Sequence, residues 1–274
     1  MNKTFAVLIC VYHGDEPGPF RRALASIFAN TLQPAQVVLV VDGPVGPETS
    51  AVIDAFSAAY ASLSVVRCVE NIGFSAALNK GLGVIDADWV VRADSDDWNL
   101  PHRFEALTQM MAPNLAIIGS SIAETNDAGE IYAIRRVPLS HAAICTYIRR
   151  RNPFNHMSVA FRRDLALKCG GYPKLMVRED YGLWASMIGA GGMGENIDEV
   201  LVHASAGTSM YQRRRSLQSY RAEIMLQRHL LRCGLTSVPG AIYYGALRSI
   251  ALTFPAAWVQ TIYKVFLRDK QAAK

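Results

Sequence analysis

The chain has 274 residues, of which 51% are hydrophobic, and a formal net charge of +5, so it can bury the core of one large domain or of one domain with an appendage. This composition excludes a largely disordered chain. The five cysteines are scattered and odd in number, which favours a reducing compartment, and the first residues lack a long apolar region followed by a small-residue cleavage site, so we expect no secretion.

The charge is divided unevenly along the chain. Residues 203–274 hold 11 Lys or Arg against 2 Asp or Glu, a charge of +9, whereas residues 1–202 carry −4. A basic tail predicts an anionic partner. The sequence shows no recognisable nucleic-acid motif, and its tail is rich in Leu, Ile, Phe and Trp, so a membrane surface is favoured over nucleic acid.

Strands and helices are predicted to alternate through the first hundred residues. Nearly unbroken apolar runs predict strands covered on both faces, at residues 5–11, 37–41, 64–69 and 89–93. Apolar positions at helical spacing predict a helix at residues 20–28, and a further helix contains Asn79 and Gly81. Repeated strand, loop and helix units imply right-handed crossovers, so the predicted fold class is α/β, with a mostly parallel sheet and helices on both faces.

Acidic residues follow two of these strands. In parallel sheets, ligands bind outside the carboxyl ends of the strands, and Asp42 and Asp94 fall at two such ends. Asp94, Asp96 and Asp97 repel one another, so they need a cation or strong donors to stay ionised together. Oxygen ligands favour Mg²⁺ or Mn²⁺ over Zn²⁺, with phosphates completing the shell. From this stretch alone, an acidic turn capping the helix near Pro101 is an equally good interpretation.

The pattern beyond the fourth strand predicts a mixed series of elements. We expect a helix at 101–111, a strand at 115–122, a turn at 126–129 between antiparallel strands, a helix at 140–151 and a strand at 157–161. Glu179 and Asp180 then open a helix that the glycines of residues 189–192 end. The helix dipole stabilises acids at a helix start, so a structural role for this pair stays open here.

The C-terminal region is predicted to be helical. One helix covers about residues 216–233, and a second begins at Pro239 and is broken at Pro255. The apolar span 249–263 is shorter than the ~20 residues needed to cross a bilayer. Aromatic and basic side chains near its end suit it to the headgroup layer instead. Packing on the body of the protein, or forming a homodimer, is the alternative.

Four features occur in order along the chain. They are Asp42-Gly43 after an apolar strand, Asn71-x-Gly73 with Asn79-x-Gly81, Asp94-x-Asp96-Asp97, and Glu179-Asp180 after Gly170-Gly171-Tyr172. In this combination the chain resembles the family-two glycosyltransferases with the Rossmann-like GT-A fold, particularly the bacterial enzymes of surface-polysaccharide biosynthesis. We therefore divide the chain into a GT-A glycosyltransferase domain at 1–215 and an amphipathic helical region at 216–274 that is suited to membrane association.

The resemblance implies a reaction. A hexosyl or N-acetylhexosaminyl group would pass from a nucleotide-diphosphate sugar, expected to be a UDP-sugar, to a hydroxyl of a lipid-linked or oligosaccharide acceptor, with inversion and with Mn²⁺ or Mg²⁺. The implied location is cytoplasmic, peripheral at the inner face of the cell membrane. A dTDP-rhamnose donor, a nucleotidyltransferase, and a nucleotide-binding, membrane-associated protein without turnover are the alternatives. The run Gln212-Arg213-Arg214-Arg215-Ser216 lacks the Trp of the QxxRW motif, so a processive polymerase is not expected.

The resemblance also implies roles on the donor side. Asp42 matches the acid that holds the nucleobase, although Val41 stands where many relatives have a second acid. The residues implied to bind the nucleotide sugar are Asp42, Asn71, Gly73, Asn79, Asp94 and Arg214, the last chosen among Arg213, Arg214 and Arg215. The implied metal ligands are Asp96, Asp94 and His203. Their chemistry is neutralisation of the leaving diphosphate.

On the acceptor side, Asp180 matches the base that takes the proton of the acceptor hydroxyl, and Glu179 is its neighbour in the acidic pair. Gly171 and Tyr172 are implied to shape the acceptor side. Trp184 is either an apolar wall for a sugar or a core residue. His156 either faces the acceptor or is a buried histidine bonded to backbone.

Overall fold

The computed structural model describes residues 4–126, 128–176, 178–205 and 217–253. In chain order, the main elements are β1 (Phe5–Tyr12), α1 (Pro17–Phe28), β2 (Gln36–Asp42), α2 (Pro47–Ala59), β3 (Leu63–Arg67), α3 (Phe74–Val84), β4 (Trp89–Ala93), β5 (Trp98–Asn99), α4 (Arg103–Met110), β6 (Leu115–Thr125), β7 (Ile131–Arg135), α5 (His141–Tyr147), η1 (His156–Ser158), β8 (Ala160–Arg162), α6 (Arg163–Lys168), α7 (Glu179–Gly189), β9 (Met193–Ser205), α9 (Leu217–Arg232) and α10 (Val238–Thr253).

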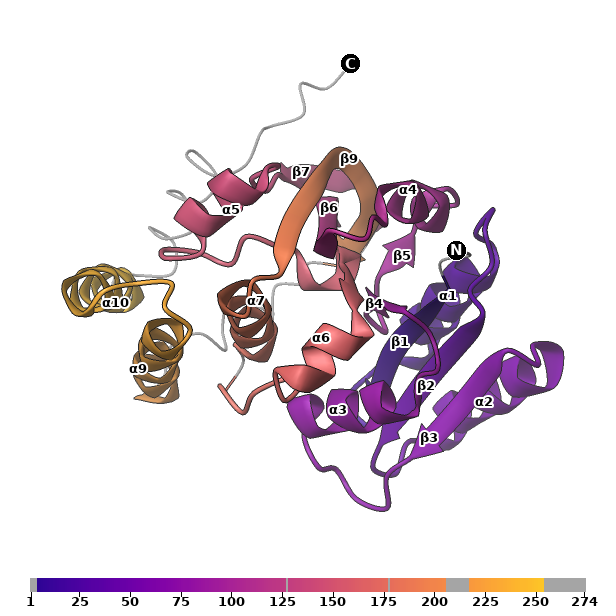
Figure 1. Ribbon diagram of the computed structural model, residues 1–274. Helices are drawn as coiled ribbons and strands as arrows, with labels where there is room; N and C mark the ends of the chain where they lie inside the picture. The colour runs from indigo at the N-terminus through magenta and orange to yellow at the C-terminus, as the bar shows by residue number, and fades with distance from the viewer. Residues whose placement is uncertain (1–3, 127, 177, 206–216, 254–274) are drawn as a thin grey trace.

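One sheet with helices on both faces organises the molecule, which confirms the α/β class (Figure 1). Its strands lie in the order β3-β2-β1-β4-β8-β6-β9-β5, and β7 pairs with β6. The first four strands are parallel to one another, as are β6 and β9. The pairs made by β8, β5 and β7 are antiparallel. The sheet is therefore parallel in its N-terminal half and mixed beyond β4.

Alternate residues of the central strands pack on opposite faces of the sheet. On β1, Val7 and Ile9 belong to the cluster that includes α1, whereas Leu8 belongs to the cluster that includes α3 and α7. Both faces are covered, so the strand is an apolar run without alternation. At Gly81 of α3, an added Cβ would lie 2.5 Å from the Leu8 side chain, so glycine allows this helix to pack closely on the sheet.

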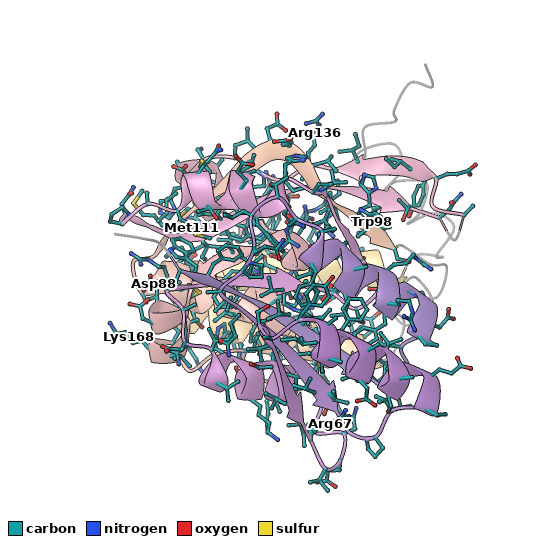
Figure 2. The ribbon with its side chains drawn as sticks, turned by 90° about the vertical axis from the view of Figure 1, so that its right-hand side faces the viewer. Arg67, Asp88, Trp98, Met111, Arg136 and Lys168 are labelled. Atoms are coloured by element: carbon teal, nitrogen blue, oxygen red, sulfur yellow. The ribbon has the colours of Figure 1, made fainter. Side chains whose placement is uncertain are left out.

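Several observed elements differ from the predicted ones. The strand predicted at 157–161 is a 3-10 turn at His156–Ser158 followed by β8 at Ala160–Arg162. The elements α2, β5, α6 and β9 were not predicted. The strand β5 has only two residues, Trp98, which is labelled in Figure 2 and is 47% exposed, and Asn99. It therefore lacks the apolar run by which strands are predicted. The antiparallel pairing across the turn at 126–129 is confirmed by β6 and β7.

The two predicted tail helices are confirmed as α9 and α10. In Figure 1, α9 lies beside α7, and α10 lies on the far side of α9. No helix in the described part of the chain is long and apolar enough to span a membrane. Pro255, the end of the apolar span at 263, and the boundary drawn at 215/216 lie outside the described residues.

Candidate active site

The acidic motif begins where β4 ends. Asp94 forms an ion pair with Arg92, with 2.5 Å between Oδ1 and Nη2, and it is about one-quarter exposed. The Arg92 side chain is buried, and it also donates a hydrogen bond of 2.8 Å to the backbone oxygen of Leu8. A fixed guanidinium therefore lies beneath the acids. The sequence reasoning missed this role, although a single basic residue inside an apolar strand next to acids could have indicated it.

Asp96 lies near two other carboxylates, Asp94 and Asp15. Burial, followed by the charges of Asp94 and Asp15, raises the pKa of Asp96 to about 6. Asp15 was not predicted to belong to the site. It follows β1, and its Oδ2 accepts a hydrogen bond of 2.9 Å from the backbone nitrogen of Tyr12. Because β1 and β4 are neighbours in the sheet, their carboxyl ends bring Asp15 to the motif.

Asp97 is buried and connects the motif to the end of β9. Its Oδ1 accepts a hydrogen bond of 2.9 Å from the backbone nitrogen of Ser205, whereas its Oδ2 finds no hydrogen-bond partner in the described part of the chain. Burial, together with the charges of Asp94 and Asp96, raises the pKa of Asp97 well above its usual value. The motif is therefore rich in acid and short of cations.

Asp94 and Asp96 are suited to supply the protein ligands of a Mg²⁺ or Mn²⁺ ion. Among the described residues, no three His, Cys, Asp or Glu side chains are arranged to hold a metal ion. Such ions, however, are commonly bound through one or two carboxylates plus phosphates and water. The buried, unpartnered Oδ2 of Asp97 and the negative charges around Asp96, whose pKa is raised by burial and by those charges, suit a site that accepts a cation. His203 lies on β9 opposite Trp98, and its part in metal binding stays a prediction.

On the donor side, Asp42 holds the loop that follows β3. Its Oδ1 accepts a 2.7 Å hydrogen bond from the nitrogen of Ile72, and its Oδ2 accepts one of 3.1 Å from the nitrogen of Gly73. Asn71 donates to the backbone oxygen of Asp42 at 3.2 Å. At Gly43, with φ of +83°, an added Cβ would lie 2.6 Å from the Asn71 nitrogen. Asp42 therefore shapes this loop, and its contact with a nucleobase stays a prediction.

The side-chain amide of Asn79 bonds to the backbone of Tyr172, and its predicted contact with the nucleotide sugar stays a prediction. Its Oδ1 accepts a 2.7 Å hydrogen bond from the nitrogen of Tyr172, and its Nδ2 donates one of 2.9 Å to the oxygen of Tyr172. A Cβ at Gly171, where φ is +72°, would lie 2.2 Å from Asn79 Oδ1. The structure thus uses the side-chain amide of Asn79 to clamp the Gly171–Tyr172 backbone, because both of its polar atoms are engaged there.

On the predicted acceptor side, Asp180 lies in the first turn of α7. Its Oδ2 accepts a hydrogen bond of 2.6 Å from Nδ2 of Asn152, a residue that sequence reasoning did not assign to the site. Burial raises the pKa of the neighbouring Glu179, and the charge of Asp180 adds to this effect. Asn152 therefore fixes one carboxylate oxygen of Asp180 and leaves the other available.

Trp184 lies beneath the acceptor side and not on an open wall. Its side chain is fully buried, and its ring packs edge-on against Phe161 and Tyr172, at centroid distances of 5.4 Å and 6.5 Å. It faces the core because it sits one turn beyond Asp180 on the side of α7 turned toward the sheet. Tyr172 is also buried, and its hydroxyl lies 3.3 Å from Nε2 of His156.

The residues predicted for the donor and the acceptor meet around His156. The Phe74 ring, which directly follows Gly73, contacts the His156 ring edge-on at 5.9 Å and lies under the Arg92 guanidinium at 5.4 Å. Burial, followed by the charge of Arg92, lowers the pKa of His156, while the charges of Asp94 and Asp180 oppose this. Both carboxylates are therefore within electrostatic reach of one imidazole. Arg213, Arg214 and Arg215 lie outside the described residues.

Comparison with known proteins places this geometry in context. The chain is 35% identical to an uncharacterized glycosyltransferase of Haemophilus influenzae, over 96% of this chain and 99% of that protein. It is 34% identical to an Escherichia coli UDP-Gal:alpha-D-GlcNAc-diphosphoundecaprenol beta-1,3-galactosyltransferase over 96% of each chain. The amylovoran biosynthesis glycosyltransferase AmsE of Erwinia amylovora is 33% identical over 95% of this chain and 98% of its own.

Solved structures show the same fold. Residues 1–349 of Staphylococcus aureus TarS superpose with a TM-score of 0.69 at 14% identity, covering 96% of this chain and 75% of that one. A mannosyltransferase of Pyrobaculum calidifontis in complex with GDP-Man and Mn²⁺ gives 0.61 at 16% identity, covering 95% and 79%. These neighbours confirm the GT-A fold. The family model for "Glycosyl transferase family 2" matches residues 6–171, and the chain belongs to that family.

Proposed function

We propose that this protein transfers a hexose or N-acetylhexosamine from a UDP-sugar to a hydroxyl of a lipid-linked or oligosaccharide acceptor, with inversion, in polysaccharide biosynthesis. The observation that carries the proposal is that residues from both halves of the chain meet at His156. Phe74 packs on its ring and on Arg92, the partner of Asp94. The hydroxyl of Tyr172 lies 3.3 Å from Nε2 of His156. The E. coli relative, whose name specifies a UDP-Gal donor and a diphosphoundecaprenol-linked acceptor, supports the donor and acceptor classes.

Asp180 is the residue that would accept the proton. Asn152 holds its Oδ2 at 2.6 Å, so Oδ1 is the atom left for the acceptor hydroxyl. A deprotonated hydroxyl that attacks from the face opposite the leaving diphosphate inverts the anomeric carbon. Asp94 and Asp96 would hold the divalent ion, which supplies neutralisation of charge on the diphosphate. The ion pair with Arg92 fixes the position of the Asp94 carboxylate at the end of β4.

The reaction can be tested with purified protein, a panel of UDP-, GDP- and dTDP-sugars, and a synthetic polyprenyl diphosphate sugar as acceptor. We expect product from a UDP-sugar in the presence of Mn²⁺ or Mg²⁺, and losses of about 100-fold or more in kcat for Asp180→Asn and Asp96→Ala. The matched control is Asp164→Asn, which removes an exposed acid from the first turn of α6. Full transfer by both site variants would refute the assignment, and product from dTDP-rhamnose alone would change the donor.

We also propose that α10 binds the membrane surface where a lipid-linked acceptor lies. Among the described side chains of this helix, five apolar ones are more than half exposed: Val238, Ile242, Tyr243, Leu247 and Ile250. The last four lie on the side of the helix opposite Ala241 and Arg248, whereas Val238, its first residue, lies outside this apolar stripe. Arg221 and Arg228 of the adjoining α9 are exposed, and the tail as a whole carries +9. An apolar stripe bordered by positive charge fits the headgroup layer of an anionic bilayer.

A further inference from the structure

A buried carboxylate in the tail joins three elements. Glu223 of α9 is 1% exposed, and its Oε2 lies 3.3 Å from Nη2 of Arg178, the residue that precedes α7. Its Oε1 lies 3.2 Å from Nη1 of Arg248 on α10 and accepts a hydrogen bond of 2.8 Å from Gln227. One acid therefore serves two arginines from two other parts of the chain, in an interior where a lone charge would be costly.

The position of Glu223 is fixed because α9 packs along the whole length of α7. In the middle of α7, Nε2 of His229 donates to the backbone oxygen of Gly182 at 3.0 Å and lies 2.9 Å from Oγ of Ser186. At the C-terminal end, a Cβ on Gly189 would lie 2.6 Å from the backbone oxygen of Cys233. The two helices run in the same direction, so Glu223 falls at the N-terminal end of α7. This is the end that begins with Glu179 and Asp180.

Arg178 directly precedes α7 and lies two residues before Asp180, which is in the first turn of that helix. Burial and the charge of Arg248 lower the pKa of Arg178, whereas the charges of Glu223 and, more weakly, Asp180 raise it. Nε of Arg178 finds no acceptor within the described residues, so the N–H group at Nε is not used in a hydrogen bond there. A guanidinium that turned from Glu223 toward Asp180 would pair with it and weaken it as a base.

We propose that Glu223 is a positioning residue for the transfer reaction: it retains Arg178 on the C-terminal helices and so leaves Asp180 free to take the acceptor proton. This inference rests on the proposed function of Asp180. It gives α9 a part in catalysis without any contact to substrate, through an ion pair that crosses from the tail to the start of α7.

A double-mutant comparison in the full-length protein tests the proposal. We expect Glu223→Gln to lower kcat by roughly 10- to 100-fold with little change in the KM for the UDP-sugar, because general-base catalysis contributes on that scale. The acid limb of the kcat profile should move to lower pH. The titratable groups that interact with Asp180 are Glu179, His156, Tyr172 and Arg178, and Asn152 donates a hydrogen bond to it; of these, only Arg178 changes its partner. Adding Arg178→Gln to Glu223→Gln should restore most of kcat.

Three outcomes decide the matter. An active wild type whose Glu223→Gln variant keeps its kcat and acid limb overturns the positioning role alone, as does a double variant no better than Glu223→Gln. A wild type that transfers from no donor rejects the proposed function instead. His229→Gln is the control for helix docking, and it should lower Tm without moving the acid limb. If Glu223→Gln does not fold, Glu223→Asp, which keeps the charge on a shorter arm, replaces it in the same comparison with Arg178→Gln.

Discussion

Single buried cations set the electrostatics of the acidic motif. Arg92 lies beneath Asp94, and the guanidinium of Arg103 donates a hydrogen bond of 2.7 Å to the backbone oxygen of Arg92. Burial lowers the pKa of Arg103 to about 9, and the charges of Asp97 and Asp94 oppose this shift. The protein therefore supplies part of the positive charge of the site itself, while Asp96 remains under-compensated.

Asp96→Asn should stabilise the substrate-free protein in a pH-dependent way. The folded-state pKa of about 6 lies above the ordinary value of 3.8, so the ionised carboxylate opposes folding by an amount that grows between these two pH values and is complete above the higher one. Because the Asp96 side chain is exposed, solvent screening leaves an effect of about 1 kcal/mol. Urea unfolding at pH 7.5 should show the gain, and the two proteins should converge near pH 4. An equal gain at both pH values would contradict this explanation.

Among the elements, those buried on both faces could be predicted from the sequence. The strands β1, β2, β4 and β6 are apolar runs because helices cover both sides of them. The long strand β9 escaped prediction because the register with β6 shifts between Ser120 and Ser121, where Ile197 and Val200 are successive partners. That bulge, together with Glu195, Asp198 and Glu199, removes the alternation on which strand prediction depends.

Only those residues of the candidate site that form a local sequence motif could be predicted. The acids at 94–97 and 179–180 are adjacent in sequence and follow a strand or open a helix, so they could be found. The partners that give them their properties are distant: Asn152 lies 28 positions before Asp180, and Asn79 lies 93 positions before Tyr172. No periodicity of the chain encodes such pairs.

The junction of α3 with the loop before Pro173 supplies a prediction of its own. Gly171→Ala should destabilise the protein by on the order of 3 kcal/mol, because the new Cβ would meet Asn79 Oδ1 at 2.2 Å in a backbone with φ of +72°. Gly170→Ala is the matched control, since φ there is +86° but nothing lies within 4 Å of the added atom. It should cost only the backbone strain, about 1 kcal/mol. Equal losses in chemical unfolding would show that the clamp contributes nothing.

For the whole molecule, the test concerns the exposed side of α10. Replacing Ile242 and Leu247 by Glu should abolish co-sedimentation with vesicles that contain anionic lipid, because it puts two charges into the apolar stripe. Wild-type binding should weaken as salt is added. Val84→Glu, at a similarly exposed apolar position on α3, should leave binding unchanged. If wild type instead forms a dimer that the double variant dissociates, with no vesicle binding in either, this side of α10 is a subunit interface.

The clamp between Asn79 and the Gly171–Tyr172 backbone also restricts how this enzyme can be recombined with its relatives. A chimera that imports a relative's segment around residue 171 changes one partner of this interaction, while the other partner, Asn79 on α3, stays as it is in this chain. Exchange of that segment therefore requires a small amide at position 79 and a glycine at 171 in the same chain, or replacement of both together.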